Sequence, residues 1–173
     1  SLDWQAQFIA PGGLVFEPFA AGRTDYYSFS DVPGALPGNT VTGDSFGRVL
    51  GYAGAELSWP LINTTGPADT ILEPMLQALV ASDDSESGRI INEDSQTAEL
   101  DETLLFEHNR ATGYDLWEEG ARLSYGLRST TIWGANNQLR GFIGQSRRLD
   151  GDPVFAANSG LFEDDSDIIV AGE

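Results

Sequence analysis

Residues 122–133, RLSYGLRSTTIW, carry the pattern from which the fold is predicted. Apolar side chains occupy odd positions: Leu123, Tyr125, Leu127 and Trp133. Polar side chains occupy even positions between them: Arg122, Ser124 and Arg128. Successive side chains of a β-strand point to opposite faces, so this alternation predicts a strand with one apolar and one polar face.

The same alternation recurs along the chain and predicts an all-β protein. Over residues 1–10 the even positions, including Leu2 and Trp4, are apolar, which predicts a half-buried strand. Over residues 51–61 the apolar side chains face away from Glu56. Further strands are predicted at residues 14–30, 138–148 and 167–170.

Residues 70–81, TILEPMLQALVA, are ambiguous. Leu72, Leu76 and Val80 fit an alternating strand, but they also fit an apolar helical stripe. Leu, Met, Gln and Ala favour helices, so propensity alone slightly favours a helix here. Pro74 is compatible with the first turn of a helix or with the side of a strand that makes no hydrogen bonds.

The connections between these segments alternate in length. Turn signals predict short connections at residues 11–13, 63–69 and 134–137. Long connections are predicted at residues 31–46, 83–114 and 149–166. Short turns on one side and long loops on the other are typical of a membrane β-barrel. No apolar run approaches the ~18 residues of a transmembrane helix.

The charge of the chain excludes several classes of function. Nine basic and 27 acidic side chains give a net charge of −18, and every basic residue is Arg. A chain this acidic is not expected to bind nucleic acid. The absence of Cys excludes disulfides, thiolate chemistry and a Cys-based zinc site. Fourteen of the acids fall in residues 83–102 and 149–167, which predicts an acidic rim at the loop side.

Three short motifs are better explained as ordinary surface features. Residues 43–47, GDSFG, match the nucleophile elbow of serine hydrolases, with Ser45 followed later by acids and by His108, but a Pro/Gly-rich loop precedes Ser45 where a strand is required. His108, the only histidine, has no second His or Cys beside it and is predicted to be solvated or hydrogen-bonded. Residues 150–152 and 163–167 lack the spacing of an EF-hand, so a solvated charge run is favoured over Ca²⁺ binding.

The arginines are predicted to lie on the polar face of the sheet. If the apolar face meets lipid, Arg122, Arg128 and Glu56 face the lumen, and so do the arginines predicted in the next strand, Arg140, Arg147 and Arg148. A guanidinium group there can pair with carboxylates or with phosphate groups, and structural pairing with acids is the favoured role.

Several blocks, taken in order, resemble the outer-membrane LPS-assembly protein family, LptD, also called the organic solvent tolerance family. Arg48 with residues 51–61 and 70–74 begins the pattern. Stronger matches follow at residues 92–95 (NEDS), 105–115 (LFEHNRATGYD), 118–127 (EEGARLSYGL), 144–146 (GQS) and 159–161 (SGL). Together these blocks span about the last two thirds of the chain.

The resemblance implies that residues 70–82 form a strand and that residues 83–114 form an extracellular loop. The fold is then an antiparallel meander of about seven strands, a segment of a large outer-membrane barrel. The whole chain, residues 1–173, would be a single β domain within the C-terminal barrel of a longer protein. The family-motif residues of the long loop are Asp94, Ser95, Leu105, Phe106, Asn109, Arg110, Gly113 and Asp115.

The resemblance also implies a non-catalytic function in the cell outer membrane. A barrel of this family receives lipopolysaccharide from periplasmic bridge proteins, holds a lipoprotein plug and inserts lipopolysaccharide into the outer leaflet without a cofactor. Two alternatives remain at the level of sequence: a soluble all-β binding module and, less favoured, a serine hydrolase that uses Ser45.

Overall fold

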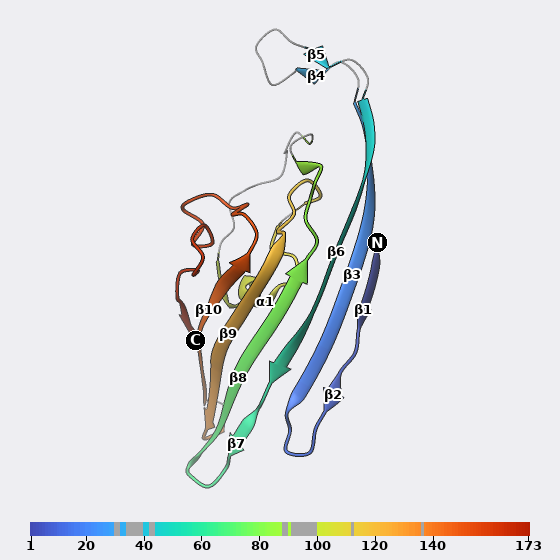
Figure 1. Ribbon diagram of the computed structural model, residues 1–173. Coiled ribbons are helices and arrows are strands. Elements are labelled where there is room, and N and C mark those ends of the chain that lie inside the picture. The colour runs from blue at the N-terminus through green and yellow to red at the C-terminus, as the bar shows by residue number, and fades with distance from the viewer. Residues whose placement is uncertain are drawn as a thin grey trace.

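The regular secondary structure of the described residues is almost entirely β-strand (Figure 1). The computed structural model describes residues 1–29, 32–33, 40–41, 44–87, 90, 100–111, 113–135 and 137–173. One short helix, α1 (Glu102–Phe106), accompanies the strands in these ranges. The strands are β1 Leu2–Gln5, β2 Phe8–Ile9, β3 Val15–Phe29, β4 Val32–Pro33, β5 Thr40–Val41, β6 Asp44–Ser58, β7 Leu61–Asn63, β8 Ala68–Ala81, β9 Gly120–Trp133, β10 Asn137–Asp150 and β11 Ile169–Gly172.

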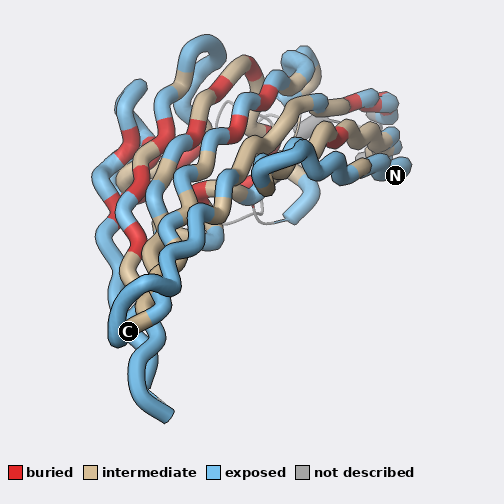
Figure 2. Tube along the Cα trace, turned by 90° about the horizontal axis from the view of Figure 1, so that it is seen from below, coloured by how far each residue is buried: buried red, intermediate tan, exposed pale blue. Residues whose placement is uncertain are grey.

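Nine of the strands form one antiparallel sheet with the path β1-β3-β6-β8-β9-β10-β11, and β4 pairs with β5 in a separate two-stranded sheet. Strand β2 continues the line of β1 beside β3, and β7 continues the line of β6 beside β8. The predicted meander of about seven strands is therefore confirmed. Among the strands that the structure describes, no pairing joins β11 to β1, so the sheet is open, and it is curved across its strands (Figure 2). This is the form of a barrel segment.

The two faces of the sheet differ in what they carry. On β6, Phe46, Arg48 and Leu50 are buried, whereas Val49 between them is exposed. We call the face that carries Arg48 the inner face and the opposite one the outer face. The outer face exposes large apolar side chains, among them Leu72, Leu76, Val80, Leu127, Leu139 and Ile143.

The segment with ambiguous periodicity is strand β8, so the helix that propensity favours is wrong and the strand implied by the family resemblance is right. The alternation of β8 places its even positions on the outer face, and pairing with β6 and β9 on both sides outweighs local propensity. Pro74 has no N–H to donate, but it lies opposite the break between the end of β6 and the start of β7, so the strand tolerates it. Its carbonyl oxygen still accepts from Trp59 N at 3.1 Å.

The other predicted strands are confirmed with shifted boundaries. Strand β6 begins at Asp44, so the predicted loop at residues 31–46 includes the start of a strand. The predicted strand at residues 1–10 is interrupted between β1 and β2, and its side chains are mostly exposed rather than half-buried. No helix among the described residues is long and apolar enough to cross a membrane.

Residues 100–111 and 113–119 fold back onto the inner face, and α1 lies behind the sheet in Figure 1. The helix begins where the Asp101 side chain accepts from Leu104 N at 2.7 Å, which caps one of the free N–H groups of its first turn. Leu105 is fully buried against Phe142 of β10 and Ile169 of β11. The sequence pattern predicts a loop here and not a helix.

Two glycines on the inner face make room for these contacts. A Cβ at Gly54 would lie 2.6 Å from the Phe19 ring and 2.4 Å from the Ala78 carbonyl oxygen. A Cβ at Gly144 would lie 2.6 Å from Leu105 and from the Phe142 ring. All four distances are shorter than a Cβ atom allows. Only glycine therefore lets Phe19 lie across β6 and lets α1 pack on β10.

The two faces of β8 give a direct test of which one meets lipid. An arginine on the outer face at the middle of a membrane strand costs roughly 2–4 kcal/mol. We expect Leu76→Arg to lower the free energy of unfolding by that amount, measured by denaturant titration in lipid vesicles. Met75→Arg is the matched control, because Met75 lies beside Glu102 and Glu107 on the inner face and should be tolerated. Equal losses at both positions would contradict the assignment of faces.

Candidate functional site

The Arg48 guanidinium is the centre of an ionic cluster on the inner face. Its side chain is 1% exposed and pairs with Asp25 of β3 at 2.9 Å and with Asp84 of the loop after β8 at 2.8 Å. It also donates to the Tyr27 hydroxyl at 2.8 Å and to the Asp115 carbonyl oxygen at 3.0 Å. A buried guanidinium is tolerated only when its donors are paired, so this one group joins two strands and two loops.

A second ionic cluster attaches the loop that precedes β9, which carries Arg110 and Glu118, to β9 itself. Glu118 is hydrogen-bonded to Arg110 within the loop, with Arg110 Nε at 2.9 Å, and to Arg122 of β9, also at 2.9 Å. Arg122 additionally donates to the carbonyl oxygens of Glu107 at 2.5 Å and of His108 at 2.8 Å. The Arg122 guanidinium therefore binds both the loop backbone at residues 107–108 and the Glu118 carboxylate.

Aromatic contacts complete the attachment of the loop. The His108 ring stacks on Phe19 of β3, with centroids 3.6 Å apart. The Tyr52 ring of β6 contacts two other rings, with its centroid 6.1 Å from that of Phe19 and 6.1 Å from that of Trp117. Trp117 Nε1 donates to the Ser82 carbonyl oxygen at 2.8 Å, so the loop is also tied to the end of β8.

The surroundings of the loop shift two pKa values. Burial alone raises the pKa of Glu118, but the hydrogen bonds and charges of Arg110 and Arg122 outweigh it, and the pKa lies below the usual 4.5. Burial lowers the pKa of His108 below 6.5, and although Glu107 opposes that shift, the charge of Arg122 adds to it. The loop is therefore held with Glu118 ionised and His108 neutral.

The structure brings most of the family-motif residues to this loop. Leu105 and Phe106 belong to α1, and the Phe106 carbonyl oxygen accepts from Gln77 of β8 at 2.6 Å. Arg110 and Asp115 take part in the two ionic clusters. Asn109 and Gly113 line a recess of about 370 Å³ between the loop and strands β1, β3 and β6. Asp94 and Ser95 lie outside the described residues.

Four of the five arginines expected on the polar face do lie on the inner face. Arg122 is buried, Arg128 pairs with Glu73 at 3.1 Å, Arg140 pairs with Glu173 at 2.7 Å and Arg148 pairs with Asp164 at 3.1 Å.

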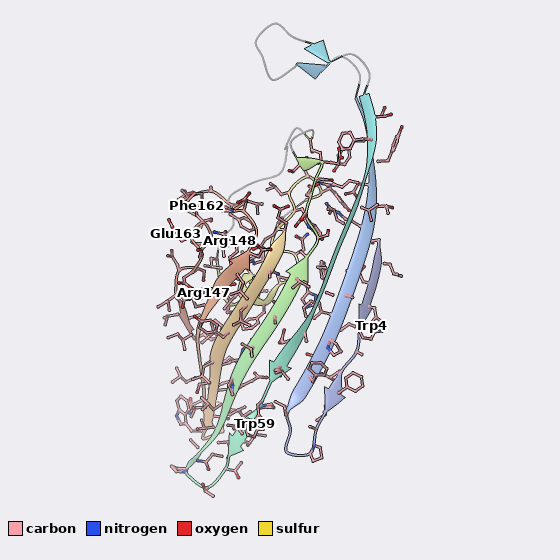
Figure 3. All side chains as sticks on the ribbon, in the orientation of Figure 1. Trp4, Trp59, Arg147, Arg148, Phe162 and Glu163 are labelled. Carbon is pink, nitrogen blue, oxygen red and sulfur yellow. The ribbon has the colours of Figure 1, made fainter. Side chains whose placement is uncertain are left out.

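Arg147 is the exception. It follows the alternation of β10 onto the outer face, where it lies 3.7 Å from Asp165 (Figure 3). The prediction that Arg147 faces the lumen side is wrong because Arg147 and Arg148 are adjacent in one strand and must point to opposite faces.

Glu56 lies on the inner face as expected, half-buried and accepting from Gln77 Nε2 at 3.3 Å. The long loops after β8 and β10 leave the same end of the sheet, as the loop order predicted. The acidic rim is incomplete, however, because Asp84 is buried under Arg48.

The hydrolase geometry is absent at Ser45. Ser45 lies inside strand β6 and pairs with Ser28, whereas a nucleophile elbow requires a turn into a helix. His108 stacks on Phe19, which pairs with Gly54 at the other end of β6. At ~3.4 Å per residue the two groups are separated by roughly 30 Å along the strand.

The residues of β3 that bind the loop are not among those predicted from the sequence. Arg23 donates to the Tyr114 carbonyl oxygen at 2.5 Å, and Asp25 and Tyr27 bind Arg48. A signal was present, since Arg23, Asp25 and Tyr27 share the odd positions of the strand, on the face of Phe19. Their partners are distant in the chain, and a single sequence does not reveal them.

An open antiparallel sheet with an apolar outer face, a charged inner face and a loop folded onto that inner face defines an outer-membrane barrel segment as a class. The family comparison agrees with it. The model of the family LptD: LPS transport system D matches residues 1–173, so the chain belongs to this family of outer-membrane proteins, which acts in lipopolysaccharide transport and assembly. No curated protein matches the chain.

Glu118 neutralises two buried arginines, which gives a test of the second cluster. Glu118→Gln leaves Arg110 and Arg122 without their counter-charge, and breaking a buried pair in this way costs about 3–5 kcal/mol. We expect the free energy of unfolding to fall by that order in denaturant titrations. Glu163→Gln, which neutralises an exposed acid in the last long loop, is the control and should change it little. Equal effects of the two variants would refute the assignment.

The pKa shifts give the pH dependence of the loop. Neutral His108 contributes stability above pH 6.5, and this is lost as the pH falls through its lower folded pKa. Ionised Glu118 contributes stability above pH 4.5, and this is lost as the pH falls through its own lower folded pKa. Once hydrogen-exchange rates are corrected for the pH dependence of intrinsic amide exchange, the protection of residues 107–119 should therefore fall in two stages on acidification. His108→Gln should remove only the first stage; an unchanged first stage would exclude His108 as its source.

Proposed function

We propose that this chain is an internal part of the barrel domain of an outer-membrane lipopolysaccharide translocon and that its inner face lines the lumen. The polar sugar and phosphate portion of lipopolysaccharide passes along that face, while the acyl chains remain in the membrane. The function is non-catalytic. The observation that carries the proposal is the match of the family model to the whole chain, joined to a sheet whose two faces suit two different solvents.

The outer face supports contact with lipid. On β8 every outward side chain from Leu72 to Val80 is apolar, a stretch that covers roughly 21 Å of height at ~3.4 Å per residue and a strand tilt of about 40°. This approaches the ~25 Å apolar band of a barrel. Trp59 and Trp133 lie exposed near the short-turn end, where an aromatic girdle is expected. A soluble binding module would leave these side chains in water without a partner.

The inner face supports a polar path. A hollow of about 620 Å³ near the short-turn end is lined by charged and apolar side chains together, including Arg128, Arg140, Glu102 and Phe142. The two guanidinium groups lie on neighbouring strands and each is paired with one carboxylate, Glu73 or Glu173. Exposed pairs of this kind contribute only ~0–1 kcal/mol, so they can exchange partners with a passing phosphate group.

The buried arginines have a different role in this proposal. Arg48 and Arg122 are buried and bind the loop and the strands through ion pairs and hydrogen bonds, so they hold the wall of the lumen and do not contact lipopolysaccharide. The lipoprotein plug and the periplasmic bridge proteins would contact parts of the barrel on the lumen and periplasmic sides.

Adjacent residues of β10 test which face lipopolysaccharide follows. Gln138 lines the inner hollow, whereas Leu139 is exposed on the outer face at the same height. A photo-crosslinking residue at position 138 should capture lipopolysaccharide in cells, and one at position 139 should capture much less. Both positions are near the short turns, away from the outer leaflet. Crosslinking only from position 139 would overturn the proposed path.

The exposed arginine pair gives a milder prediction. Arg128→Gln removes a half-exposed ion pair with Glu73 and should change the free energy of unfolding by less than about 1 kcal/mol. If phosphate groups pass this point, lipopolysaccharide crosslinking from position 138 should decrease in the Arg128→Gln variant. Unchanged crosslinking would remove Arg128 from the path.

A further inference from the structure

The recess beside the loop combines aromatic rings with neutralised charges. It has a volume of about 370 Å³, within the range of small-molecule sites. Its walls come from β1, β3, β6 and the loop, and they include Asp3, Arg23, Tyr52, Asn109, Tyr114 and Trp117.

Tyr114 is the ring that remains accessible there. Its side chain is 73% exposed, although the backbone around it is firmly held, because its carbonyl oxygen accepts from Arg23 at 2.5 Å and from Arg48. The Arg23 guanidinium lies 5.6 Å from the Tyr114 ring centroid and 5.4 Å from that of Trp117. The ring is thus placed over the recess by a fixed backbone and a cation–π contact, not left free at a loop tip.

The polar groups of the recess suit a neutral, hydroxyl-rich ligand. Arg23 is already paired with Asp25 at 3.1 Å, and Asp3 adds a carboxylate, so the site has no excess of positive charge for a phosphate group. The Asn109 amide can both donate and accept, the Arg23 guanidinium donates and the Asp3 carboxylate accepts. Aromatic faces with such a set of donors and acceptors match the two kinds of surface on a pyranose ring, its C–H face and its hydroxyl rim.

We infer that this recess binds a sugar ring, with Tyr114 stacking on the pyranose face and Asn109, Arg23 and Asp3 contacting its hydroxyl groups. The inference rests on the proposed function, because the saccharide portion of lipopolysaccharide is the sugar that would pass the inner face. The recess would be a binding site for the saccharide on that path, beside the folded loop. Two of its lining residues, Asn109 and Gly113, are family-motif residues for which the ionic clusters give no role.

The test uses the reconstituted protein and a core oligosaccharide from which the lipid and the phosphates have been removed. We expect saturation-transfer NMR to show binding through the sugar protons, and titration calorimetry to show about tenfold weaker binding for Tyr114→Ala, the loss expected for one stacked ring. Tyr114→Phe keeps the ring and should bind like the unmodified protein. Tyr26→Ala is the matched control, since Tyr26 is 75% exposed but on the outer face, and it should change nothing.

Three results would overturn the inference. The first is unchanged affinity in Tyr114→Ala, and the second is an equal loss of affinity in Tyr114→Ala and Tyr26→Ala. The third is no binding of the dephosphorylated oligosaccharide, whether or not a phosphorylated lipid A analogue binds. Crosslinking of lipopolysaccharide from position 138 distinguishes this failure from failure of the proposed function. If that crosslinking persists, the inner-face path stands and only the sugar site is lost.

Discussion

The pairing of the buried Arg48 guanidinium is the interaction on which the inner face depends. A buried charge must find hydrogen-bond partners, and Arg48 finds them in β3, in the loop after β8 and in the segment before β9. These partners are far apart in the chain, so one side chain fixes how two loops lie on the sheet. The Glu118 cluster repeats the same arrangement on β9, with Arg122 binding both a carboxylate and backbone carbonyls. The loop is held as part of the wall.

The outer face follows the opposite rule, and the strand period joins the two. Each residue on the inner face is followed by one on the outer face, so charged groups such as Arg48 alternate with apolar ones such as Val49. Glycine is used where the inner face must accept bulk, as at Gly54 under Phe19 and at Gly144 under Leu105. A sheet built this way has one face suited to lipid and one face suited to polar groups, which matches the outer-membrane family to which the chain belongs.

The sequence predicts the sheet much better than the site. Alternation and turn signals correctly give most of the strands and the separation of short from long connections, because these depend on local pattern, whereas strand β8 and the number of strands follow from the family resemblance. The helix preference for β8 fails because pairing with β6 and β9 outweighs propensity. The lumen-side placement of Arg147 fails because adjacent residues of β10 point to opposite faces and Arg148 takes the inner one. The contacts of Arg23, Asp25 and Asp84 depend on long-range folding of the loop, which one sequence does not contain.

Hydrogen exchange of residues 113–119 in Arg48→Gln, compared with the unmodified protein, tests most directly whether the loop is anchored by buried arginine pairing. Loss of a buried charge pair costs about 3 kcal/mol or more, which corresponds to roughly a hundredfold faster opening. The account predicts that the Trp117 and Glu118 amides exchange faster by this order, while the amides of β9 and β10 at the short-turn end keep their protection. Unchanged protection of residues 113–119 would contradict the account, because the loop would then be held by other contacts.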